Sequence, residues 1–300
     1  MRGTHRAIVV VCLFLLGWMA GCAPRIPTRP AVSSQAPGTL PKTADGIAFI
    51  RGGEAFVIRG GAEREVLTDG SKKVAVSYSA DRKNLLVAEE LGVRRVVVLV
   101  PVDRQGPTSV VLDSDAGSSL GTVRVAGSPE LVYFSVYGDS ASRLSVSGIA
   151  KGSDVSAVPL GNAFSGEFDV DVAGDSLVYT GSGQNPATLI LRTGSSERLL
   201  VAGLATAFTP AFSRDGARIC FTGGERAGSE ISVWVVDTDS DKPRVIAGTS
   251  SLTPASPVFS PAGDRIAVRG GEDGAIWVVP VAGGRPQRLD VNCDDAPIAW

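Results

Sequence analysis

The sequence predicts an all-β protein, a six-bladed β-propeller with four antiparallel strands in each blade. A unit of four short apolar runs separated by turn residues recurs along most of the chain. Units of roughly 40 to 45 residues are typical of propeller blades. No stretch after the N-terminus repeats its apolar residues at the spacing of an amphipathic helix. The two ends of the chain also complement each other, as a closed ring requires.

Residues 209–246 show the unit most clearly. The runs PAFS, ARICF, ISVWVV and PRVI are rich in β-branched and aromatic residues, and clusters of Asp, Gly, Ser and Pro separate them. Such runs are typical of strands joined by tight turns. The next unit, which begins at Ser256, repeats the order and places Phe259 where Phe212 stood. We therefore expect four antiparallel strands per unit.

A small or apolar residue that starts the second strand marks each unit. The markers are Ile47, Leu85, Leu131, Leu177, Ile219 and Ile266. Their spacings are 38, 46, 46, 42 and 47 residues, so six blades fit the chain.

The first unit begins at Asp45-Gly46, a turn that elsewhere follows the innermost strand, and so lacks that strand. The last residues, APIAW, supply it, with Trp300 in the place of Phe212 and Phe259. A ring of blades is held shut when its first and last segments share a blade. The sequence thus predicts that the C-terminal strand joins the N-terminal blade.

The turns after the first strands resemble those of a known family. AFS-RDG, VFS-PAG and YSADRK, with an Asp after the third strand, are similar to the WD40-like (PD40) repeats of TolB β-propellers. The resemblance covers about residues 45–300 and implies a six-bladed propeller, most often used to bind other proteins. TolB has a further N-terminal α/β domain where this protein has a short linker, so a role in the Tol–Pal system is not implied.

The N-terminus predicts a bacterial lipoprotein. Residues 1–21 combine Arg2 and Arg6 with an apolar run too short to cross a bilayer comfortably, as in a signal peptide. The sequence Met-Ala-Gly-Cys ending at Cys22 resembles a lipobox, in which the cysteine is acylated and becomes the new N-terminus. Two acyl chains anchor a protein without spanning the membrane. The alternative is an ordinary secretory signal with a chance cysteine.

The predicted domains follow from this. Residues 1–21 are the signal peptide, residues 22–44 a tether with five prolines, and residues 45–300 the propeller. The expected location is the bacterial cell envelope, outside the cytoplasm.

Composition excludes several function classes. The chain has 29 basic and 31 acidic residues, which argues against nucleic-acid binding. Its one histidine, His5, lies in the predicted signal peptide. The mature protein would therefore lack a Ser-His-Asp centre and any histidine-containing metal site. We expect that the protein is not an enzyme and that it binds no cofactor or metal, although catalysis by carboxylates alone stays open.

Two groups of carboxylates could carry chemistry. Asp237, Asp239 and Asp241 alternate as at the start of a calcium loop but lack its glycine and closing glutamate, so a solvated hairpin is the favoured interpretation. Asp169 and Asp171 share one face of a first strand. Asp171 occupies the turn-capping serine position and is expected to make an Asx-type cap. Asp169 faces the channel and either bonds a neighbouring blade or belongs to a ligand site.

Two cysteines remain beyond the N-terminal segment. Cys220 belongs to a second strand and Cys293 to the loop before the closing strand, so we expect them to be too far apart to pair. A disulfide is the alternative that an envelope location permits. Trp234 and Trp277 are expected in the core between blades.

One rim of the propeller is the predicted partner surface. The loops between second and third strands carry acidic residues, namely Glu89, Glu90, Asp139, Glu225, Glu272 and Asp273. Loops on a rigid scaffold often carry binding residues.

Two functions from different classes fit these observations. The first is a membrane-anchored lipoprotein, held through Cys22, whose propeller binds a protein partner without catalysis. The alternative is a propeller that binds a small ligand or glycan in the channel near Asp169, with carboxylate-dependent catalysis possible in principle.

Overall fold

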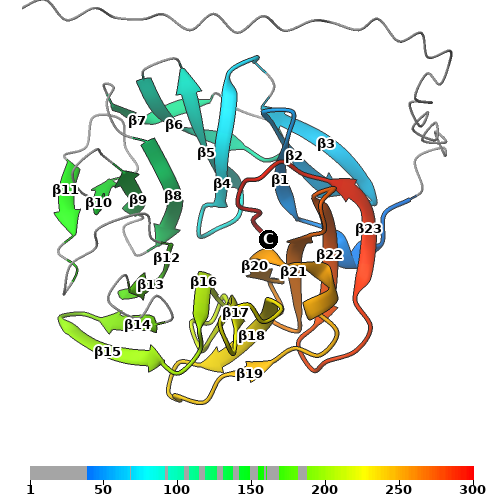
Figure 1. The fold of residues 1–300 in the computed structure, drawn as a ribbon. Coiled ribbons are helices and arrows are strands. Elements are labelled where there is room, and N and C mark those ends of the chain that lie inside the picture. The colour runs from blue at the N-terminus through cyan, green and yellow to red at the C-terminus, as the bar shows by residue number, and fades with distance from the viewer. Residues whose placement is uncertain are drawn as a thin grey trace, which may run out of the picture. The chain divides into compact units, whose positions relative to one another are not determined.

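The computed structural model describes residues 39–67, 69–91, 94–104, 108–114, 119–126, 131–137, 142–148, 155–158, 160, 169–181 and 188–300. These residues form six antiparallel sheets around a central axis, with the C-terminus near that axis (Figure 1). The predicted fold class, a six-bladed all-β propeller, is confirmed. The first sheet has three strands, and the C-terminal segment adds to it at the ring closure.

Each blade is one sheet whose strands follow one another in the sequence. The first blade holds β1 (Ala48–Arg51), β2 (Glu54–Arg59) and β3 (Ala62–Leu67). The second holds β4 (Lys72–Tyr78), β5 (Asn84–Leu91), β6 (Arg94–Pro101) and β7 (Ser109–Ser114), and the third β8 (Ser119–Ala126), β9 (Leu131–Tyr137), β10 (Ser142–Gly148) and β11 (Val155–Val158).

The remaining three blades repeat the pattern. The fourth holds β12 (Val170–Ala173), β13 (Ser176–Gly181), β14 (Thr188–Thr193) and β15 (Ser196–Val201), and the fifth β16 (Thr206–Phe212), β17 (Arg218–Gly224), β18 (Ser232–Asp237) and β19 (Arg244–Val245). The sixth holds β20 (Ala255–Phe259), β21 (Arg265–Gly270), β22 (Ala275–Pro280) and β23 (Gln287–Asn292). Two short 3-10 helices, η1 (Lys42–Ala44) and η2 (Ser250–Leu252), also occur.

The C-terminal segment closes the first blade as predicted, but it pairs over less length than a full strand. Ala48 and Ala299 exchange backbone hydrogen bonds at 2.7 and 2.9 Å. Trp300 Nε1 donates to the carbonyl of Asp45 at 2.9 Å. Pro297 has no N–H to donate to a ladder, which accounts for the short pairing.

Among the described residues, six hydrophobic clusters form the core, and each lies between two neighbouring blades. Successive residues of β1 point to opposite faces, so Ile50 packs toward the second blade and Phe49 toward the sixth. Trp234 is buried between blades and Trp277 packs against the same kind of cluster, as predicted. Because every blade packs on both neighbours, the ring holds its loops on a rigid frame.

The two cysteines of the propeller are unpaired, as expected. Cys220 is buried in the cluster between the fifth and sixth blades, and Cys293 in the one between the sixth and first. Burial raises the pKa of the Cys293 thiol to about 12. These positions favour a packing role for both side chains.

Candidate functional site

The central channel contains a cavity of about 340 Å³ to which all six blades contribute. Its walls are the innermost strands and the turns that follow them. The charged side chains of the lining are Arg82, Arg124, Asp169, Asp171 and Arg214. A cavity of this size is within the range of small-ligand sites and also admits one or two side chains of a partner.

Asp171 on β12 joins three blades. Its Oδ1 accepts a hydrogen bond from Nε of Arg124 on β8 at 2.7 Å, and its Oδ2 accepts one from the amide of Phe212 on β16 at 2.6 Å. The predicted Asx-type cap is therefore wrong, because neighbouring blades take both oxygens. Burial raises the pKa of Asp171, while the charge of Arg124 and the Phe212 amide oppose that rise.

Serine makes the turn cap at the equivalent positions of other blades. Ser213 Oγ accepts from the amide of Arg218 at 2.9 Å and donates to Asp215 at 2.5 Å. Ser79 makes the same two bonds in its own blade, to the Asn84 amide and the Asp81 carboxylate. Asp81 and Asp215 are thus bonded to the serine of their own turn.

Asp169 lines the cavity and immediately precedes β12. Its Oδ2 accepts a hydrogen bond from the amide of Thr209, in the next blade, at 2.9 Å. Thr209 has a φ of 47°, a left-handed conformation that is unusual for a β-branched residue. Asp169 was expected either to bond a neighbouring blade or to belong to a ligand site, and the structure shows the bond to the neighbouring blade. Its role toward a ligand stays a prediction.

Arg82 and Arg214 line the cavity from the turns after β4 and β16. The Arg82 guanidinium lies over the ring of Tyr78, 4.1 Å from its centroid. Tyr78 is itself fixed, because its hydroxyl donates to the carbonyl of Gly46 at 2.8 Å. Burial lowers the pKa of Arg82, Tyr78 opposes this shift, and the positive charges of Arg214 and Arg59 add to it. This end of the cavity therefore carries positive charge.

A second cavity, of about 590 Å³, lies over the junction of the first and second blades. Gly52 and Gly53 line it, together with residues 70–74 and 294–296. Asp294 accepts hydrogen bonds from the amides of Gly52 at 3.0 Å and Gly53 at 2.9 Å. The carboxylate thereby ties the closing segment to the β1–β2 turn.

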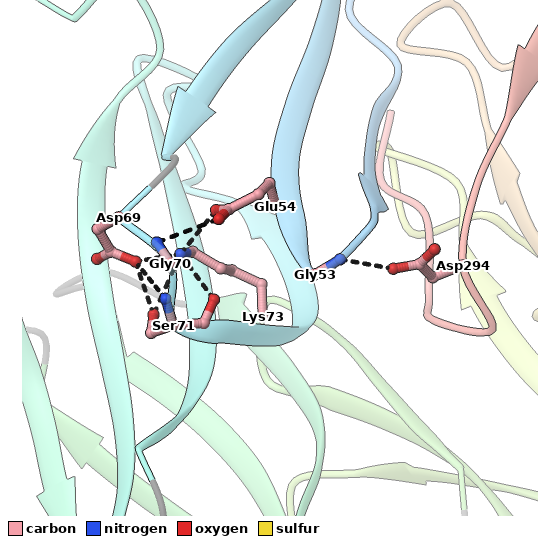
Figure 2. A network of polar contacts seen from close by, with 7 residues as sticks. All are labelled: Gly53, Glu54, Asp69, Gly70, Ser71, Lys73 and Asp294. Carbon is pink, nitrogen blue, oxygen red and sulfur yellow. Dashed lines mark hydrogen bonds and ion pairs between the residues drawn. The ribbon is translucent and has the colours of Figure 1, made fainter.

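A buried lysine crosses the same junction (Figure 2). The Lys73 side chain is 0% exposed, and its Nζ lies 2.9 Å from Glu54 Oε2 and also pairs with Asp69. It donates further to the carbonyl of Ser71 at 2.9 Å. Burial alone would lower the pKa of Lys73, but the bonds to Asp69 and Glu54 raise it above its ordinary value. For Asp69, burial is likewise outweighed by bonds from Lys73 and Ser71, which lower its pKa to about 2.

Some of the acidic residues predicted for the rim lie in loops and others do not. Glu225 and Glu272 are exposed in the loops after β17 and β21, and so is Asp273, which accepts from the Ala275 amide at 3.2 Å. Glu89 and Glu90 were wrongly placed, because they lie within β5, where Glu89 is buried opposite Lys73.

The rim and the channel are separate. Glu225, Glu272 and Asp273 line neither cavity, so the structure does not bring them together with Asp169. Their role in partner binding stays a prediction, and Asp139 lies outside the described residues.

Within the described part of the protein, no group of three or more His, Cys, Asp or Glu side chains could hold a metal ion. Asp237 begins a hairpin in which its carbonyl accepts from the Ser240 amide at 3.0 Å. The acidic triplet is therefore a turn.

The sequence analysis did not identify four positively charged side chains of the two cavities. Arg82 and Arg214 stand inside the Ser-containing turns of the repeat, so their place in the motif could have located them at the channel. Arg124 belongs to a degenerate repeat, and Lys73 looks in the sequence like any exposed lysine. Asp171 lies 47 residues from Arg124 in the sequence, and Glu54 reaches Lys73 from another strand, so only the fold identifies these two contacts.

The predicted signal peptide, lipidation site at Cys22 and most of the tether lie outside the described residues. Among the helices that the structure describes, none has the length and hydrophobicity to cross a bilayer.

Solved structures share this architecture. TolB from Acinetobacter baumannii is 17% identical, with a TM-score of 0.69 over 87% of this chain and 68% of that chain. A protein assigned as TolB in Agrobacterium tumefaciens is also 17% identical, with a TM-score of 0.61 over 81% of this chain and 87% of that chain.

A protein of another kind shares the propeller architecture too. The tricorn protease is 13% identical, with a TM-score of 0.54 over 85% of this chain and only 27% of its own. No family model matches the sequence, and no curated protein matches it either. At these identities the likeness establishes the fold alone. The protein therefore has the six-bladed β-propeller fold seen in TolB proteins.

Proposed function

We propose that this protein is a lipid-anchored protein of the bacterial cell envelope whose propeller binds a protein partner without catalysing a reaction. The proposal depends on one observation: the carboxylates of the channel accept hydrogen bonds from neighbouring blades. Asp171 bonds Arg124 and the Phe212 amide, and Asp169 bonds the Thr209 amide. A general acid or base must reach a substrate proton, whereas these groups hold blades together. Such a ring is suited to presenting a rigid binding surface.

The anchoring part of the proposal rests on the sequence of residues 1–22. A short apolar run followed by Met-Ala-Gly-Cys supports cleavage before Cys22 and its acylation. The proline-rich tether would then separate the propeller from the membrane. The TolB-like fold supports a location outside the cytoplasm.

The test is a crosslinked affinity purification of detergent-solubilised native protein from its own membranes. Mass spectrometry identifies both the partners and the N-terminal peptide, and the Cys22→Ser variant is purified in parallel. We expect an acylated Cys22 peptide and a reproducible partner in the wild type, with loss of membrane attachment in the variant.

A surface variant makes the test specific. Glu225→Lys and Glu272→Lys reverse charges on exposed loops of the predicted rim and should leave the fold intact. A partner lost from these variants would assign the rim as its contact surface. The absence of any reproducible partner from crosslinked wild-type membranes would contradict the proposed function.

A small-ligand function is favoured by one observation, the channel cavity of about 340 Å³ beside Asp169. Asp169→Asn keeps a side-chain oxygen that can accept from Thr209 while removing the charge. If the channel binds or turns over a small ligand through this carboxylate, the variant should lose that activity at unchanged thermal stability. Unchanged activity in the variant would exclude this alternative.

A further inference from the structure

The end of the channel cavity formed by the turns after the innermost strands carries two arginines without an acidic partner. Neither Arg82 nor Arg214 lies in an ion pair within the part of the protein that the structure describes. The charge of the third cavity arginine, Arg124, is satisfied by Asp171. A guanidinium group offers only hydrogen-bond donors and no acceptor.

The nearest acidic residues in the sequence do not neutralise them. Asp81 precedes Arg82, but its carboxylate accepts from Ser79 Oγ at 2.7 Å and from the Lys83 amide at 2.9 Å. Asp215 follows Arg214 and bonds Ser213 Oγ and the Ala217 amide. Both aspartates are thus committed to their own turns.

Arg82 is also held in place. Its guanidinium lies on the Tyr78 ring, and the backbone at Arg82 has a φ of 61°, a left-handed conformation. A side chain at Gly46 would approach within 3.1 Å of Arg82 Nη2, so the glycine leaves room for the guanidinium. A fixed guanidinium loses little entropy when it binds an anion.

The channel brings the two arginines to one cavity although they come from the second and fifth blades. Burial is the main cause of the lowered pKa of Arg82, and the positive charge of Arg214 adds a smaller contribution in the same direction. Like charges gathered in a partly enclosed cavity attract an oppositely charged ligand. The walls beside them include the aromatic rings of Tyr78 and Trp300.

We propose that Arg82 and Arg214 bind a carboxylate that a peptide segment of the partner inserts into the channel cavity. Arginine suits this role because its planar fork matches the two oxygens of a carboxylate. The inference rests on the proposed protein-binding function and adds the site and the chemistry of recognition. The carboxylate can belong to an acidic side group or to the C-terminus of the partner, and the test separates the two.

The experiment measures fluorescence anisotropy of labelled peptides with the purified full-length protein. The first peptide is rich in Glu and Asp and has an amidated C-terminus. The second replaces these residues by Gln and Asn and has a free C-terminal carboxylate, and the third has the same Gln and Asn residues with an amidated end. We expect the first, the second or both to bind, and the third not to bind. Binding by the first assigns acidic side chains, and binding by the second assigns the C-terminal carboxylate.

The variants test the two arginines directly. Arg82→Gln and Arg214→Gln should each weaken binding by about tenfold or more, as expected for the loss of a charged hydrogen bond. Arg64→Gln is the matched control, because Arg64 is exposed on β3 and lines neither cavity. Thermal unfolding of each variant verifies that the fold persists.

Two results would overturn the inference. One is the absence of binding by both carboxylate peptides, and the other is binding that the Arg82→Gln/Arg214→Gln double variant does not weaken. Crosslinking with the same double variant separates this inference from the proposed function. A partner recovered at undiminished yield would retain the function and reject the arginine site.

Discussion

Arg124 on β8 and Asp171 on β12 form an ion pair between the third and fourth blades, with 2.7 Å between Nε and Oδ1. Their side chains are only 19% and 12% exposed. Removal of one partner from a buried pair leaves the other charge without compensation. This pair and the bond from the Phe212 amide to Asp171 connect three consecutive blades near the channel.

The first prediction concerns this pair. Asp171→Ala should lower the free energy of unfolding by about 3 kcal/mol, because Arg124 would stay buried without an anion. The double variant Arg124→Met/Asp171→Leu should lose less than the sum of the single losses. Urea denaturation of Arg124→Met, Asp171→Leu and the double variant measures the coupling. Asp239→Ala, at an exposed hairpin position, is the control, with an expected change within about 0.5 kcal/mol. Strict additivity would contradict the predicted coupling.

The second prediction compares two adjacent lysines. Lys73 is buried against Glu54 and Asp69, while Lys72 is 69% exposed in its pair with Glu90. Lys73→Met should cost about 3 kcal/mol of unfolding free energy, because it leaves carboxylates at the junction without a cation. Lys72→Met should cost less than about 1 kcal/mol, as surface pairs do. Equal effects in denaturant titrations would show that the Lys73 network contributes no more than a surface pair.

The third prediction concerns acid stability. The pKa of Asp69 is about 2 in the folded protein, below its ordinary value of 3.8. The folded state therefore binds this proton less readily than the unfolded state, so the contribution of Asp69 is present above about pH 4 and is lost as the pH falls to about 2. Asp69→Asn should flatten the stability profile in this window. Thermal unfolding midpoints between these pH values measure the slope, and Asp239→Asn should retain the wild-type slope.

The repeat pattern predicted the architecture because blade order is local information. Each strand pairs with the next one in the sequence, so turns and apolar runs were sufficient to place strands such as β16 and β17. Ring closure was also predictable, since the turn at Asp45 and Gly46 lacked its preceding strand and the last residues supplied one.

The polar contacts between blades were not predictable in the same way. Asp171 occupies a serine position of the repeat, and the sequence alone suggested the local bond that serine makes. Its actual partners lie 47 and 41 residues away, and their approach depends on how neighbouring sheets pack. The same holds for Lys73 and Glu54, because nothing in adjacent residues distinguishes a buried lysine from an exposed one.

The last prediction concerns the closing segment. Asp294 accepts from the amides of Gly52 and Gly53, whereas its neighbour Asp295 pairs with Arg269 and is 89% exposed. Asp294→Ala should cost about 1.5 kcal/mol, because two backbone donors lose a charged acceptor, whereas Asp295→Ala should cost less than about 1 kcal/mol. Hydrogen exchange should also become faster in β1 for Asp294→Ala alone, since the ring opens most readily where Ala48 and Ala299 make a single bridge. Unchanged exchange of the β1 amides would show that the Ala48–Ala299 bridge and the contact of Trp300 with Asp45 are sufficient to hold the ring closed.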